Sequence, residues 1–107
     1  MDGEKSGDGV YQWNKNEFYI GKFHKNLFDG DGDMTTKDYH YRGHFSMGRK
    51  EGRGTFRDFG GKFSYTGEFR NNRPCGEGEI TYEDGAVMRG RFDGFETVEG
   101  TLTLPGG

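Results

Sequence analysis

The chain has 107 residues, which is enough for one compact domain or a short stack of repeats and too few for two ordinary domains. Only 29% of the residues are hydrophobic, a share typical of disordered chains, but aromatic residues reach 16% and large rings can supply a core. The net charge of -3 gives no reason to expect nucleic acid as a partner, because nucleic-acid-binding domains are generally strongly basic.

The N-terminal stretch MDGEKSGDG lacks the apolar run of a signal peptide, and no segment is long and apolar enough to span a bilayer. Cys75 is the only cysteine, so an internal disulfide is excluded and a reducing compartment fits. We therefore expect a cytoplasmic protein, with association to the cytoskeleton or a membrane left open.

A glycine and aromatic motif recurs along the chain. The pattern Y-x-G-x-F begins at Tyr19, Tyr41 and Tyr65, and a fourth copy begins at Met88. Its glycines are 22, 24 and 23 residues apart. A second pattern, G-x-G followed by an apolar residue, comes after each copy at a nearly constant distance and also opens the chain at residues 7–11. Such regularity indicates a tandem-repeat protein.

Both patterns alternate with a period of two residues, which predicts strands. Helices are excluded by the frequent glycines, each of which costs about 1 kcal/mol relative to alanine in a helix. Pairs such as Asn71-Asn72 and Asp84-Gly85 suit tight hairpin turns. The predicted fold is all-β, a single-layer antiparallel meander. Its strands are expected near residues 8–13, 18–24, 31–36, 39–46, 53–58, 62–69, 77–82, 86–92 and 98–104.

Glycine and aromatic residues share one face of these strands, and a ring can lie over the bare backbone of a neighbouring glycine. We expect the glycines of the Y-x-G-x-F copies to accept such rings. They are Gly21, Gly43, Gly67 and Gly90.

At these residues the chain resembles the MORN repeat family (membrane occupation and recognition nexus), whose unit reads roughly YxGxFxxGxxxGxGxxxxxDG. The match is close over residues 41–56 and closer over 65–85. The resemblance implies an elongated twisted sheet with a concave groove, and roles in scaffolding, peptide binding, cytoskeletal or ciliary assembly and phosphoinositide contact. The predicted array spans 7–104, as a half repeat at 7–17 and repeats at 18–38, 39–61, 62–85 and 86–104.

Candidate catalytic and metal-binding residues are few. His40 and His44 share a strand face but lie about 13 Å apart along it, too far to chelate one ion unaided. Cys75 has no histidine partner that the sequence places beside it, and the DGDGD stretch at 29–33 lacks the glutamate of a calcium loop. We therefore predict no enzyme activity, no cofactor and no metal.

Charge is unevenly distributed. Residues 41–75 carry eight basic and three acidic side chains, whereas both flanking segments are acidic. Hairpin loops bring part of this basic belt to one edge, where it suits an anionic lipid or an acidic partner segment, or serves solubility alone. The belt residues are Arg49, Lys50, Arg53, Arg70 and Arg73.

A one-layer ribbon cannot cover both of its faces, so some rings are expected to stay accessible and line a protein-binding groove. The predicted groove residues are Tyr41, Phe45, Phe56, Tyr65, Phe69 and Tyr82. The preferred hypothesis is a non-catalytic scaffold that binds a partner peptide or amphipathic helix in this groove. The alternatives are peripheral binding to anionic lipid and an accessory repeat segment of a larger enzyme. The free edges of the outer strands also leave a homodimer open.

Overall fold

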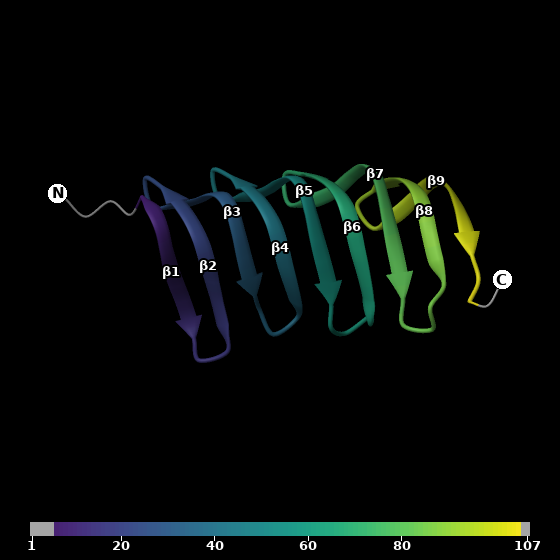
Figure 1. Cartoon of the computed structure of the whole chain (residues 1–107), viewed down its shortest axis with the longest axis horizontal. Helices are drawn as coiled ribbons and strands as arrows, with labels where there is room; N and C mark the ends of the chain where they lie inside the picture. The colour runs from purple at the N-terminus through teal and green to yellow at the C-terminus, as the bar shows by residue number, and fades with distance from the viewer. Residues whose placement is uncertain (1–5, 106–107) are drawn as a thin grey trace.

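Residues 6–105 are the ones that the computed structural model describes, and they form a single open sheet of nine antiparallel strands in sequence order (Figure 1). The prediction of an all-β meander is confirmed. The strands are β1 (Gly7–Asn14), β2 (Glu17–His24), β3 (Leu27–Thr35), β4 (Tyr39–Ser46), β5 (Arg49–Asp58), β6 (Phe63–Arg70), β7 (Arg73–Tyr82), β8 (Val87–Asp93) and β9 (Glu96–Thr103).

The array is elongated, measuring 57 × 27 × 17 Å. Its Cα radius of gyration is 15.4 Å. A compact domain of similar length has a radius of gyration of about 13 Å. Each strand pairs only with its neighbours in sequence, as expected of a repeat protein.

A row of glycines crosses the whole sheet, one from each strand. In the pairing register each of these glycines lies directly opposite the glycine of the adjacent strand. The row consists of Gly9, Gly21, Gly32, Gly43, Gly54, Gly67, Gly78, Gly90 and Gly100. A Cβ at Gly43 would come within 2.5 Å of the Cα of Gly54, so the two backbones approach more closely than side chains allow.

Tyrosine rings fill the space beside this row. A Cβ at Gly54 would lie 2.5 Å from the Tyr41 hydroxyl and 2.6 Å from its Cε1, and Tyr65 covers Gly78 in the same way. The Tyr41 hydroxyl donates a hydrogen bond to the carbonyl of His44, at 2.9 Å. The ring therefore lies mainly over the second glycine of the G-x-G pair. The predicted acceptor, Gly43, is required chiefly by the approach of the neighbouring strand.

The second strand of each hairpin begins earlier than predicted. Strand β5 starts at Arg49 and not near residue 53, and β3 and β7 start about equally early. The predicted strands begin just after Gly30, Gly52 and Gly76, but the positive φ of Gly52 (76°) occurs inside β5, where the pairing register with β4 shifts. This geometry is a β-bulge, which bends a strand without ending it.

The hairpin tips at the upper edge of Figure 1 lean toward the preceding repeat, and backbone hydrogen bonds hold them there. The Gly48 amide donates to the carbonyl of Phe28, the Asn72 amide to Lys50, and the Gly94 amide to Pro74. These bonds make Phe28, Lys50 and Pro74 equivalent positions of three successive repeats.

The core lies on the face that carries the rings of the Y-x-G-x-F motifs, which we call the aromatic face. From the second copy of the motif onward, each motif phenylalanine packs edge-on against the tyrosine of the preceding repeat: Phe69 and Tyr41 have ring centroids 5.0 Å apart. Edge-to-face pairs of this kind are favourable beyond the area that they bury. The buried cluster comprises Tyr19, Phe23, Met34, Tyr41, Phe45, Phe56, Tyr65, Phe69, Ile80 and Phe92.

Candidate functional site

Five of the six predicted groove residues are buried, so the expectation that these rings stay accessible is wrong. Tyr41 and Tyr65 are 0% exposed, and the most accessible of the five, Phe56, is 8% exposed. The other two are Phe45 and Phe69. Only Tyr82, at 37%, has the accessibility expected of a groove residue.

Contacts between repeats explain this burial. A flat ribbon would leave one side of each ring open, but here the hairpin tip of one repeat reaches rings of the repeats before it. Phe95, near the β8–β9 tip, has its ring centroid 4.9 Å from that of Phe56 and 6.0 Å from that of Tyr65. The hairpin tips of the single-layer sheet thus cover the rings on its aromatic face.

Lys50 is the clearest correction to the basic belt. Its side chain points into the aromatic face and is 8% exposed, so it does not lie on the belt surface. The Nζ donates a hydrogen bond to the Tyr39 hydroxyl at 3.1 Å, and it lies 4.6 Å from the ring centroid of Tyr39 and 5.5 Å from that of Tyr41. An ammonium over aromatic faces gains cation–π attraction. Among residues 6–105 no carboxylate forms an ion pair with it.

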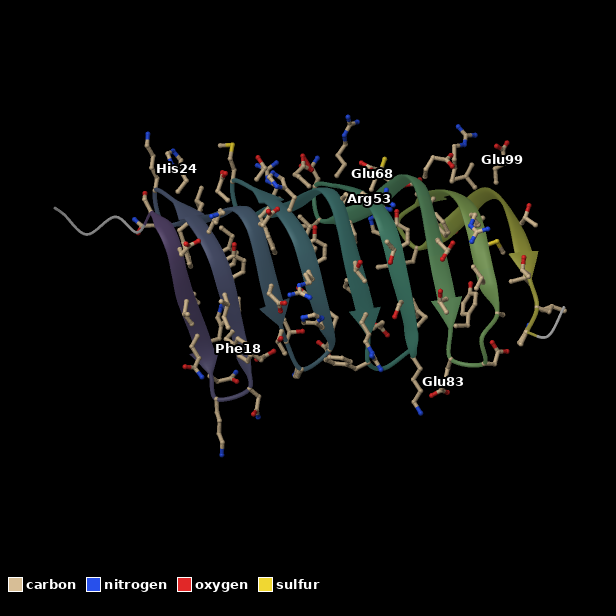
Figure 2. All side chains as sticks on the ribbon, viewed as in Figure 1. Phe18, His24, Arg53, Glu68, Glu83 and Glu99 are labelled. Carbon is tan, nitrogen blue, oxygen red and sulfur yellow. The ribbon has the colours of Figure 1, made fainter. Side chains whose placement is uncertain are left out.

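The other belt residues are exposed, and two of them have acidic partners. Figure 2 shows Arg53 of β5 beside Glu68 of β6, with a nitrogen–oxygen distance of 3.4 Å. Arg73 pairs with Asp93 at the same distance. Arg49 donates a hydrogen bond to the Asn71 side chain. The structure therefore divides the predicted belt into one buried lysine and four surface arginines, part of whose charge is compensated.

An open cavity of about 470 Å³ lies on the aromatic face, toward the N-terminal end of the array. We call it the Trp13 cavity. Its lining residues are Trp13, Glu17, Met34, Thr36, Tyr39, Phe45, Gly48, Lys50 and Asn72. They come from strands β1 to β5 and from the tips and turns of three hairpins, so the cavity is formed by the stacking of repeats.

Trp13 forms the most accessible apolar wall of this cavity and is 47% exposed. Its ring packs edge-on against Tyr11 and Phe28, with centroid distances of 5.2 and 6.0 Å. These contacts fix the orientation of an otherwise exposed indole. A half-exposed and oriented aromatic ring is the kind of side chain that protein partners bury.

Glu17 supplies the acidic group of the lining. Its carboxylate accepts hydrogen bonds from the Lys37 backbone amide at 2.9 Å and from the Asn14 side chain at 2.7 Å. The bond from the Lys37 amide is the main reason that the pKa of Glu17 lies below its ordinary value. Glu17 therefore anchors the β3–β4 turn against the β1–β2 turn and is charged at neutral pH.

The predicted histidine and aspartate candidates lie on the opposite face. His40 Nε2 is 2.6 Å from Asp33 and His44 Nδ1 is 3.6 Å from Asp31, each across the β3–β4 pair. Residues 6–105 contain no group of three or more histidine, cysteine or acidic side chains able to hold a metal ion. They also include no helix that could cross a membrane.

Sequence reasoning missed most of the Trp13 cavity. It chose rings from the motif positions of the middle repeats, whereas the accessible lining comes from Trp13, Thr36 and Tyr39, outside the G-x-F core of the motif. A signal for Lys50 was present, because a lysine occupies the position that holds Phe28 and Pro74 in the neighbouring repeats.

The fold is that of a tandem-repeat, all-β protein, and its Trp13 cavity is formed between repeats. A comparison with family models matches the MORN repeat at residues 1–17, 19–40, 41–62 and 65–87. A search of curated proteins gave no match. The chain belongs to the MORN repeat family, whose repeats are in general modules for interaction with proteins or membranes.

Proposed function

We propose that the chain is a protein-interaction scaffold that binds a peptide or amphipathic helix of a partner protein on its aromatic face. The Trp13 cavity is the centre of the proposed binding surface. It replaces the groove of buried motif rings expected from the sequence, and it retains Phe45 as part of its floor.

One observation carries this proposal. Trp13, Met34 and Tyr39 form apolar walls of an open cavity whose lining also contains polar groups. Apolar walls combined with a few polar groups are typical of a binding pocket. MORN repeats are in general interaction modules, which supports a binding role for this face.

The test compares two exposed apolar residues on opposite faces. Trp13 lines the cavity and is 47% exposed, whereas Ile20 of β2 is 50% exposed and its neighbours Tyr19 and Gly21 point to the other face. Trp13→Ala should abolish capture of a partner from cell extract, and Ile20→Ala should leave it intact. Proteins captured equally by both variants would contradict the proposal, provided that both have the wild-type circular dichroism spectrum.

Peripheral binding to anionic lipid is a second candidate, because exposed arginines occur at the tips of two successive hairpins. Arg49 follows the β4–β5 tip, and Arg70 and Arg73 flank the β6–β7 tip. Each basic residue contributes about 1 kcal/mol near an acidic membrane surface. Sedimentation with phosphoinositide vesicles should be lost in an Arg49→Gln, Arg70→Gln, Arg73→Gln variant and at high salt. Failure to sediment at low salt would remove this candidate.

A further inference from the structure

Lys50 differs from its counterparts in the other repeats by carrying a charge into the aromatic face. Phe28 and Pro74 occupy the equivalent positions, and both suit an apolar interior. Burial of an ammonium group is costly unless its donors are satisfied, so a lysine at this position needs a reason that packing does not supply.

The donors of Lys50 are incompletely satisfied. An ammonium has three N–H donors, and the structure gives Lys50 a single hydrogen-bond acceptor within residues 6–105, the Tyr39 hydroxyl. The rings of Tyr39 and Tyr41 attract the charge but accept no ordinary hydrogen bond. Because Lys50 lines the Trp13 cavity, its remaining donors can be reached from that cavity.

The rest of the lining restricts what can satisfy these donors. Glu17 already accepts bonds from Lys37 and Asn14 and forms no ion pair with Lys50. The apolar walls of the cavity are formed by Trp13, Met34 and Phe45. A fitting ligand therefore carries an anionic oxygen at one point and bulky apolar groups on either side of it.

We propose that Lys50 binds a carboxylate side chain of the partner segment. The aromatic face therefore selects peptides with an aspartate or glutamate next to a bulky apolar residue. This inference rests on the proposed function and adds the chemistry of the partner to it. The charge complements the buried ammonium, and the cavity opens on the face where the peptide is proposed to lie. A charge-assisted hydrogen bond between an ammonium and a carboxylate is stronger than a bond between neutral groups.

The experiment uses a library of displayed random peptides, selected on the full chain. Tryptophan-free peptides recovered from it are synthesised, and their binding is followed by the fluorescence of Trp13, the only tryptophan of the chain and a wall of the cavity. Each peptide is made in its acidic form and with the acidic residue replaced by its amide, Glu→Gln or Asp→Asn. This comparison requires no change in the protein.

The matched protein variants are Lys50→Met and Lys22→Met. Methionine keeps the length of the side chain without the charge, and the apolar residues at the equivalent positions indicate that Lys50→Met folds. Lys22 is an exposed lysine whose Nζ lies 3.2 Å from Asp8, outside the cavity, and controls for the loss of one positive charge.

The selected peptides are expected to share an acidic residue beside an apolar one. Conversion to the amide should weaken binding to the wild type about tenfold or more. The same conversion should change binding to Lys50→Met less than about twofold, and Lys22→Met should behave as the wild type.

Peptides that perturb Trp13 fluorescence but bind equally well as amides, or equally well to Lys50→Met, would overturn the assignment of Lys50 while leaving the proposed function in place. A library that yields no peptide sensitive to Trp13→Ala would contradict both proposals. The two failures are therefore distinguishable.

Discussion

At the scale of single residues, the contact between a motif tyrosine and a glycine of the next strand is the basic unit of the fold. A Cβ at Gly54 would overlap the Tyr41 ring, which is held by its hydrogen bond to His44 and cannot move away cheaply. Gly54→Ala should therefore destabilise the protein by about 1–3 kcal/mol, the usual cost of overpacking a core. The midpoint of urea unfolding measures the loss.

Gly60 is the control for this substitution, because a Cβ there would meet only the Asp58 carboxylate, at 3.8 Å, and its φ is not positive. Gly60→Ala should change stability by less than about 0.5 kcal/mol. Equal destabilisation by the two variants would show that chain flexibility, and not the tyrosine contact, requires glycine at position 54.

The buried tyrosines also make stability depend on alkaline pH. Loss of solvent contact raises the pKa of Tyr19 and of Tyr65 to about 12, and raises that of Tyr41 as well. Between the ordinary value of 10.0 and about 12, the unfolded chain releases protons that the folded chain retains, so stability falls as pH rises. The contribution is fully present below pH 10.0.

Urea unfolding at a series of alkaline pH values measures this effect. Tyr65→Phe removes one of the three ionisable rings, and it also removes the hydrogen bond that Tyr65 donates to the carbonyl of Glu68. The variant should be less stable at neutral pH and should lose less stability as the pH rises. A slope equal to that of the wild type would mean that Tyr65 ionises alike in both states.

At the scale of the hairpin, a side chain at the β6–β7 tip helps to bind this tip to the repeat before it. The Asn72 side-chain oxygen accepts a hydrogen bond from the Lys50 amide at 2.9 Å, and Asn72 itself has a φ of 70°. Asn72→Gly keeps the turn but removes the acceptor, so it should cost about 1 kcal/mol in urea unfolding. Asn72→Asp keeps both features and should retain the wild-type stability; a loss as large as that of glycine would exclude the hydrogen bond as the cause.

The hairpins also mark how far the sequence predicts structure. The period-two alternation of residues and the turn-forming pairs were sufficient to predict the order of the strands and the Asn71-Asn72 turn. Both features depend on local chemistry. The early start of β5 was missed because a glycine with positive φ has the same sequence signal in a turn and in a bulge. The distinction depends on pairing with the neighbouring strand, which a single strand does not encode.

At the scale of the whole molecule, the candidate site was harder to predict than the fold because it forms between repeats. The register of one repeat does not indicate that Phe69 covers Tyr41 or that Phe95 reaches Phe56, and these contacts decide which rings are accessible. Trp13 and Lys50 come together with Asn72 only when three hairpins stack. Periodicity therefore predicted the sheet, whereas the stacking of hairpin tips determines which side chains line the Trp13 cavity.

Because each strand pairs only with its neighbours in sequence, the fold also predicts how stability is distributed along the array. Every residue of β9 is exposed, and β9 pairs on one side only, whereas β4 to β6 are paired on both sides and carry buried rings. A nearest-neighbour array opens from its ends, so amide hydrogen exchange should be fastest in β9 and β1 and slowest in β4 to β6. Equal protection in all nine strands would instead indicate one cooperative unit. Protection of β9 that rises with protein concentration would show that its free edge pairs with a second copy, as expected of a homodimer.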